Sequence, residues 1–183
     1  FVNLYFDLRP SKSLQKMFRR FYLPVLIIVS LASCKKAIEY PVEPILAFKS
    51  INVTSDGTGY ASKVLVDISF TDGDGDIGYY PRESGLNDWM FDDPASMYYN
   101  NYIVKTYIRR SGVWTVDTTN VNARLPYMTP EGVNKALKGD ILRELTLPPQ
   151  LTIDTLKYDI FIWDRALHKS NIISTPEVVV STR

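Results

Sequence analysis

Three aspartates at alternate positions dominate the stretch FTDGDGDIGYY, residues 70–80. The carboxylates of Asp72, Asp74 and Asp76 repel one another within a single turn unless a cation lies among them. Calcium takes roughly six to eight oxygen ligands, and glycines between the aspartates let the backbone turn so that the carboxylates converge. The spacing therefore predicts a calcium site. Magnesium is disfavoured because it demands fewer and more rigidly placed ligands.

The acidic stretch matches only part of the EF-hand pattern. When Asp72 is counted as position one, Asp74, Asp76 and Glu83 take the other carboxylate positions. The position that an EF-hand reserves for glycine is Ile77, and the flanking segments have strand patterns. We therefore expect an aspartate-rich loop on a β scaffold. The alternative is a solvated acidic turn without metal, since Asp-Gly pairs are common in turns.

Patterns that indicate catalysis are sparse. The one histidine, His168, lies in a polar segment with no G-x-S-x-G motif nearby, and the one cysteine is Cys34. A zinc site would lack its usual ligands, and no Walker or dinucleotide-binding motif is present. Paired carboxylates for glycoside hydrolysis stay open, but the chain is small for a sandwich hydrolase with a cleft. The sequence predicts a protein that is not an enzyme.

The composition is that of a globular domain rich in strands. Of the 183 residues, 45% are hydrophobic and 13% aromatic, which favours strands over helices. The net charge is only +1, so nothing in it indicates a nucleic-acid partner. Residues 1–33 carry five basic side chains and one acidic, whereas residues 34–183 have a net charge of −3. The basic excess therefore belongs to the N-terminal segment.

The N-terminal segment has the pattern of an export signal. From Met17 the chain reads MFRRFYLPVLIIVSLASCKK, with two arginines followed by an apolar run at 21–31. This run is too short to span a bilayer as a helix but fits the core of a signal peptide. We expect residues 17–33 to be a signal peptide and residues 1–16 to be a spurious upstream extension. The alternative is a buried strand that ends in a cysteine.

The residues Leu31-Ala32-Ser33-Cys34 resemble the bacterial lipobox. The resemblance implies cleavage before Cys34, a lipid on its thiol and membrane attachment through that lipid. Lys35 stands where an aspartate is associated with inner-membrane retention, which by the same resemblance favours the outer membrane, on either of its faces. Cys34 is the only cysteine, so the exported chain forms no internal disulfide. Residues 34–44, with two prolines, are predicted to be a tether.

Residues 45–183 have the short alternating segments of an all-β domain. Every second side chain is apolar in 62–70, and 156–162 repeats the pattern. Further strands are predicted at 45–53, 102–110, 112–117, 139–147 and 172–180. About seven strands, each bounded by turn residues, predict an immunoglobulin-like β-sandwich.

Local signals refine this arrangement. Pro176 places the last strand at an edge or a bulge, and Ser111-Gly112 predicts a tight hairpin. Helical periodicity is limited to 131–138, where we expect a turn or two of helix. Residues 154–160, DTLKYDI, resemble the start of strand F in immunoglobulin-type domains, so Tyr158 is expected to hydrogen bond backward as a tyrosine corner. A chance match is the alternative.

The exported region as a whole resembles the immunoglobulin-like lipoproteins of the Bacteroidota. In that group a strand ending in F-x-D-x-D-G-D-I-G is followed much later by D-R-A-x-x-x-S-N. Residues 70–78 and 164–171 match the two patterns. With the lipobox, the resemblance spans most of residues 17–183. It implies the fold and the envelope location, and it implies little about activity because those proteins are largely uncharacterised.

The sandwich fold adds a fourth candidate ligand for the metal. In an immunoglobulin-like sandwich the B–C and F–G loops lie at the same end. With 62–70 as strand B and 155–163 as strand F, Asp164 opens the F–G loop beside the acidic turn. The alternative is that Asp164 pairs with Arg165 or is a simple turn residue.

The long segment 79–101 alternates aromatic and acidic side chains. Trp89, Tyr98 and Tyr99 are candidates for binding a glycan or peptide, although packing of the aromatic rings onto the end of the sandwich is favoured. The sequence therefore predicts a lipid-anchored envelope protein whose calcium-stabilised domain is a structural or adaptor module for an envelope partner. The alternative is a surface lipoprotein that binds glycan or peptide through 79–101.

Overall fold

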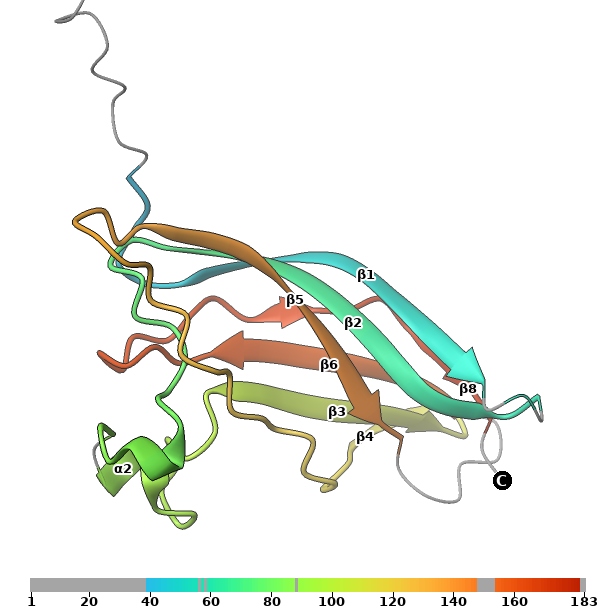
Figure 1. The fold of residues 1–183 in the computed structure, drawn as a ribbon. Helices are drawn as coiled ribbons and strands as arrows, with labels where there is room; N and C mark the ends of the chain where they lie inside the picture. Colours follow the sequence, from blue (N-terminus) through green and yellow to red (C-terminus); the bar gives the residue numbers. More distant parts are fainter. Residues whose placement is uncertain (1–38, 56, 58, 88, 148–153, 182–183) are drawn as a thin grey trace, which may run out of the picture. The chain divides into compact units, whose positions relative to one another are not determined.

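Two antiparallel sheets pack face to face in the computed structural model, which describes residues 39–183 except 56, 58, 88, 148–153 and 182–183 (Figure 1). One sheet has the order β1 (Ile45–Ser55), β2 (Ala61–Asp72), β5 (Leu137–Thr146). The other has the order β4 (Val113–Val116), β3 (Tyr102–Arg110), β6 (Asp154–Ile162), β7 (Ile173–Ser174), and β8 (Val178–Val180) also pairs with β6. These are the orders A-B-E and C′-C-F-G of an immunoglobulin-like sandwich. The predicted fold class is confirmed.

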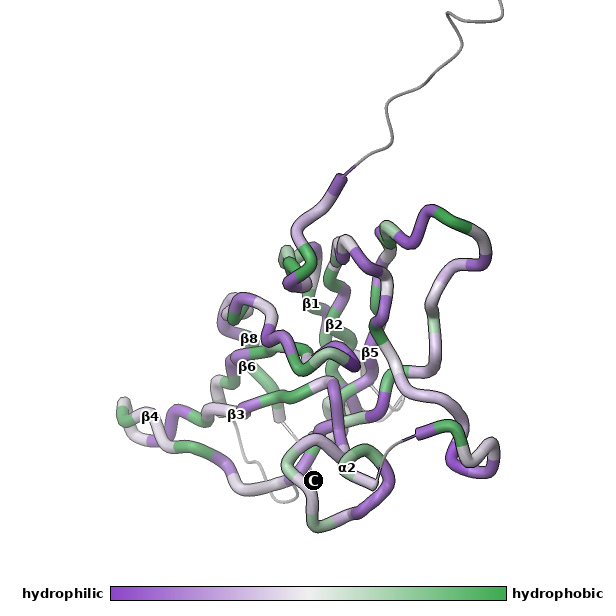
Figure 2. The backbone as a smooth tube through the Cα atoms, turned by 90° about the vertical axis from the view of Figure 1, so that its left-hand side faces the viewer, coloured by the Kyte–Doolittle hydropathy of each residue, from purple (hydrophilic) through white to green (hydrophobic). Residues whose placement is uncertain are grey.

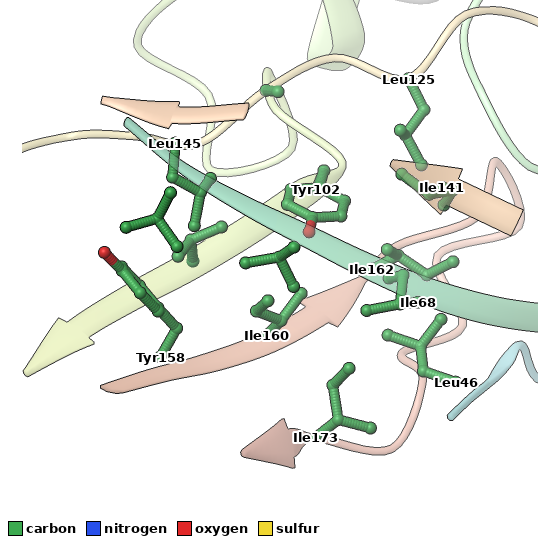
Figure 3. Close-up of a cluster of buried hydrophobic side chains, with 14 of the residues drawn as sticks. Leu46, Ile68, Tyr102, Leu125, Ile141, Leu145, Tyr158, Ile160, Ile162 and Ile173 are labelled. Atoms are coloured by element: carbon green, nitrogen blue, oxygen red, sulfur yellow. The ribbon is translucent and has the colours of Figure 1, made fainter. Parts of the chain in front are cut away.

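The core lies between the two sheets and is made by the alternating residues that the sequence singled out. In β2, Val64, Val66 and Ile68 are fully buried, and in β6 the same is true of Leu156 and Ile160. Figure 3 shows side chains from both sheets pointing toward one another, and Figure 2 shows the two rows of strands from the side. Each such aliphatic side chain contributes about 1.5–3 kcal/mol when removed from water. Packing of apolar faces therefore stabilises the domain.

The end of the chain pairs with β6 in two pieces because proline interrupts it. β7 and β8 both pair with β6, and Pro176 lies in the gap between them. There the hydroxyl of Thr175 accepts a hydrogen bond from the backbone N–H of Tyr158 at 3.0 Å. A side chain thus replaces the backbone partner that a continuous strand would supply, and Pro176 lies in an interrupted edge strand, as the prediction of an edge position or a bulge requires.

Of the predictions for the short connections, one is confirmed and another is wrong. Ser111 and Gly112 have φ values of 50° and 81°, as the predicted tight hairpin between β3 and β4 requires. The helix expected at 131–138 is wrong, because that segment makes bends and then enters β5 at Leu137. The helical turns lie instead at η1 (Arg82–Ser84) and α2 (Trp89–Asp92).

The hydroxyl of Tyr158 does not form the predicted tyrosine corner with any described residue. The side chain is 1% exposed, and its hydroxyl oxygen is buried without a hydrogen-bond partner among the described residues. Residues 148–153, which precede β6, lie outside the described residues. Burial raises the pKa of this phenol, so the hydroxyl stays neutral. The ring fills the core between the sheets.

The variant Tyr158→Phe should therefore be at least as stable as the wild type. Removing a buried hydroxyl without a partner relieves a desolvation cost of about 1 kcal/mol and leaves the ring in place. Urea denaturation of the two proteins measures the difference. A loss of 1 kcal/mol or more, by the same scale for a hydrogen bond, would show that the hydroxyl has a partner and would restore the tyrosine corner.

The predicted signal peptide and the lipobox cysteine Cys34 lie outside the described residues. Within the described part of the chain, no helix has the length and apolar character needed to cross a membrane. The end of the predicted tether does contact the domain, because the backbone oxygen of Pro41 accepts a hydrogen bond from the N–H of Gly73 at 2.7 Å. The chain therefore enters β1 beside the acidic turn.

Candidate metal centre

Four aspartates come together at one end of the sandwich. Asp72 is the last residue of β2, Asp74 and Asp76 lie in the turn after it, and Asp164 follows β6 of the other sheet. One carboxylate oxygen of each lies within 4.8 Å of the others. The sequence predicted this set of four residues, and the structure brings all of them together.

The two loops that carry the aspartates are joined by backbone pairing. Ile77 forms a β-bridge with Asp164, and the backbone N–H of Arg165 donates to the backbone carbonyl oxygen of Asp76 at 3.3 Å. The N–H of Ala166 donates to a carboxylate oxygen of Asp76 at 2.9 Å. Ile77 is fully buried, which explains why an apolar residue occupies the position that an EF-hand gives to glycine. The F–G loop and the acidic turn are therefore one unit.

Glycine is required in the acidic turn, as Gly75 and Gly78 illustrate, because other backbone segments approach it closely. A Cβ atom at Gly75 would lie 1.9 Å from the carbonyl oxygen of Lys135. At Gly78, where φ is +86°, a Cβ atom would lie 1.7 Å from the carbonyl oxygen of Pro126. Neither clash can be relieved by a side-chain rotation, since the neighbouring atoms belong to the backbone. The turn is therefore enclosed on several sides.

Hydrogen bonds satisfy only part of the carboxylate cluster. Asp72 accepts from the N–H of Asp76 at 2.9 Å, and Asp164 accepts from the N–H of His168 at 2.7 Å and contacts its ring at 3.0 Å. One oxygen each of Asp72, Asp74 and Asp76 is buried and has no hydrogen-bond partner among the described residues. Buried polar atoms are nearly always paired, so three unpartnered acceptors at one place indicate a missing positive ligand.

The raised pKa values in the cluster also indicate a missing cation. Burial, reinforced by the charges of Asp74 and Asp76, raises the pKa of Asp72 to about 7. Burial also raises the pKa of Asp164 to about 6, although its hydrogen bonds with His168 oppose the shift. Both side chains are fully buried. Without a cation the site therefore favours protonated carboxyl groups, and a cation would allow them to ionise.

The donor set is made of oxygen atoms alone, which suits a hard cation such as calcium or magnesium. His168, the one histidine, is engaged with Asp164 rather than directed to a metal. Glu83, which the EF-hand count placed at its last position, lies in the exposed η1 turn and is not part of the cluster. The four aspartates fit a divalent metal ion.

The segment 164–171, the second of the two motifs behind the family resemblance, ends in Ser170 and Asn171, and these two residues have a structural role. The amide of Asn171 accepts from the backbone N–H of Leu46 at 2.7 Å and donates to its carbonyl at 3.0 Å. The hydroxyl of Ser170 accepts from the N–H of Ile162 at 3.0 Å. Asn171 thereby ties the F–G loop to β1 of the opposite sheet, close to the metal centre.

The three aromatic residues proposed for ligand binding differ in their surroundings. Trp89 is 71% exposed, whereas Tyr98 packs edge-on against Trp163 at 5.4 Å between ring centroids. The ring of Tyr99 lies under the guanidinium of Arg124. Tyr98 and Tyr99 therefore pack against other side chains at this end of the sandwich, whereas Trp89 is exposed.

Sequence reasoning missed two arginines that organise this end of the domain. Arg124 donates to the carbonyls of Phe91 and Tyr99 and pairs with Asp92 at 3.0 Å. Arg165 donates to the carbonyl of Gly78 at 2.6 Å. Both bind backbone carbonyls of distant segments, a role that leaves no periodic signal in the sequence.

No protein-family model matches the chain, and no curated protein or solved structure is significantly similar to it.

Proposed function

We propose that the protein is a lipid-anchored component of the cell envelope whose immunoglobulin-like domain binds calcium and acts as a structural or adaptor module. The observation that carries the metal part is the set of buried, unpartnered oxygens on Asp72, Asp74 and Asp76. The lipobox around Cys34 supports the anchor. Outer-membrane location follows from the resemblance to bacterial lipoproteins.

Calcium fits the cluster better than magnesium. Four carboxylates from two loops supply several oxygens, which the large and flexible coordination shell of calcium accepts. Magnesium requires near-octahedral geometry and keeps most of its waters. The cation would neutralise charges that burial otherwise opposes, and it would link the ends of the two sheets.

Calorimetric titration of the metal-free protein tests the site directly. We expect one calcium ion to bind per chain, magnesium to bind more weakly at equal concentration, and Asp74→Asn to weaken binding. Asp74 is chosen because it is the most accessible of the four and its replacement leaves the hydrogen bonds of the loops in place. Absence of any calcium heat from the wild type would contradict the proposal.

The two motifs behind the family resemblance meet in the structure, which supports reading them as one feature. The acidic turn and the loop 164–171 share the metal centre and the bridge between Ile77 and Asp164. The resemblance to Bacteroidota lipoproteins therefore stands as part of the proposal for both fold and location.

The variant Cys34→Ala should lose membrane association, because it lacks the thiol that would carry the lipid. Fractionation of cells expressing the wild type and the variant measures this. The wild type is expected in the membrane fraction after a carbonate wash and the variant in the soluble fraction. A variant that still resists the wash would contradict the lipoprotein assignment.

A non-catalytic role is proposed because no catalytic sequence motif accompanies His168, the one histidine. An adaptor should have a stable partner, so purification of the anchored protein from its native membrane should recover another envelope protein in a constant ratio. Glycan or peptide binding near 79–101 is the second candidate, and a cavity beside that segment favours it.

A further inference from the structure

A cavity of about 330 Å³ opens beside the metal centre between the segments 79–82 and 124–127. Its base is fixed by the backbone N–H of Tyr79, which donates to the carbonyl of Leu125 at 3.0 Å, and by a β-bridge between Tyr79 and Pro126. This volume lies at the lower end of the range of small-molecule sites, about 300–1,000 Å³. It suits a ligand of one or two rings.

One wall of the cavity is flat and aromatic. The rings of Tyr80 and Tyr127 stack with centroids 4.2 Å apart and an angle of 20° between their planes. The guanidinium of Arg165 lies 4.6 Å from the ring centre of Tyr127, and Arg165 also holds the carbonyl of Gly78 in the acidic turn. Pro81 and Pro126 add rigid apolar surface. Because the two tyrosine rings stack on each other, the wall offers a ligand the edges, the hydroxyl groups and at most one outer face of the stack.

The cavity is also positively charged, and its two arginines differ in how they are used. The guanidinium of Arg124 is already engaged, since it pairs with Asp92 and binds two backbone carbonyls. Arg82 is exposed, and among the described residues it donates only to the hydroxyl of Tyr99, at 3.2 Å, and weakly to the carbonyl of Asp92, at 3.4 Å. It has no ion pair with a carboxylate of the described residues. Its remaining donors can therefore bind an anion.

We propose that this cavity binds an acidic sugar residue, with the carboxylate on Arg82 and the sugar ring beside the stacked pair of Tyr80 and Tyr127. Guanidinium groups bind carboxylates through paired, charge-assisted hydrogen bonds. The open, hydroxyl-lined aromatic wall suits a hydrated polyol ring. The proposal goes beyond the calcium site and rests on the second candidate function, glycan or peptide binding near 79–101. It assigns the binding to the cavity residues instead of Trp89, Tyr98 and Tyr99.

Titration with a tetramer of galacturonic acid, compared with a neutral glucose tetramer, tests the proposal by calorimetry on the wild type. We expect the acidic tetramer to bind and the neutral one to bind at least about tenfold more weakly, because the charge-assisted contacts are lost. Arg82→Gln should reduce affinity for the acidic tetramer by a similar factor. Arg109→Gln removes an equally charged side chain that packs over Trp114 in the β3–β4 hairpin, and should bind like the wild type.

Calcium could itself bridge an acidic sugar to the aspartates, so a separate titration must test whether the sugar binds at the metal centre. The same titration with Asp74→Asn, and with metal-free wild type, should still show binding of the acidic tetramer. Binding that disappears in Asp74→Asn and survives in Arg82→Gln would overturn the cavity assignment and place the sugar on the metal. Absence of binding to the wild type would also overturn it, while calcium heats measured separately would leave the metal proposal standing.

Discussion

At about pH 8 the protein should unfold at a markedly higher temperature in calcium than in metal-free buffer, and the difference should shrink as the pH falls to about 5. A ligand that binds only the native state stabilises it by about 2.7 kcal/mol at a hundredfold excess over its dissociation constant. For a chain of this size that raises the melting temperature by roughly 5–10 °C. Scanning calorimetry at fixed free calcium measures it.

The pH dependence follows from the raised pKa values of the cluster. In metal-free protein the pKa of Asp72 is raised to about 7 and that of Asp164 to about 6, so between about pH 4 and 7 the native state binds more protons than the unfolded chain. Stability without metal therefore falls as pH rises through this window. The pKa of His168, raised by Asp164, acts in the same direction, because its contribution is lost as the pH rises through the raised value. Calcium competes with these protons and gains effect at higher pH.

Two variants separate metal binding from simple repulsion. Asp72→Asn should be more stable than the wild type in metal-free buffer at about pH 8, because a buried charge is removed, and it should respond little to calcium. Glu83→Gln removes an exposed acid outside the cluster and should keep the full calcium response. Unfolding curves of the wild type that coincide with and without calcium at about pH 8 would leave the aspartates as a solvated turn.

Replacing Gly78 by alanine should cost about 3 kcal/mol or more of the free energy of unfolding, from two separable causes. A left-handed backbone at an alanine costs about 1–2 kcal/mol, and the added Cβ atom would overlap the backbone of Pro126. Displacing Pro126 also disturbs the base of the cavity and the turn that holds the aspartates. Urea denaturation measures the loss, and calcium affinity should fall with it.

The matched control is Gly85→Ala. Gly85 has a φ of +64° and would bring its Cβ atom within 4 Å of no other group, so this variant reports the backbone cost alone. We expect it to lose about 1 kcal/mol. Equal losses in the two variants would show that the segment at Pro126 moves aside easily and that the acidic turn is less enclosed than its contacts indicate.

The strands were predictable because the domain is built on alternation. In β3 the predicted and observed bounds coincide at 102–110, and in β2 every second residue is buried as the pattern requires. The four aspartates were predictable for a related reason, since the sandwich topology places the ends of β2 and β6 together.

The connections were less predictable because tertiary contacts decide their form. The segment at 123–125 is held by β3 and its neighbours: Ala123 pairs with Tyr102, and the N–H of Leu125 donates to the side chain of Asn101 at 2.6 Å. The next segment enters β5 where its composition suggested a helix. The cavity beside Tyr80 depends on these same contacts between distant segments. Secondary-structure propensity and residue spacing in the sequence do not predict these tertiary contacts.

The metal centre also has a consequence for the rate at which the domain opens. Its ligands come from two segments about 90 residues apart, one at the end of each sheet, so the cation can be held only after the sheets have docked. Contacts that form after the transition state slow unfolding and leave folding nearly unchanged. Bound calcium should thus lengthen the lifetime of the native state, which in a chain without an internal disulfide would give protection against proteases.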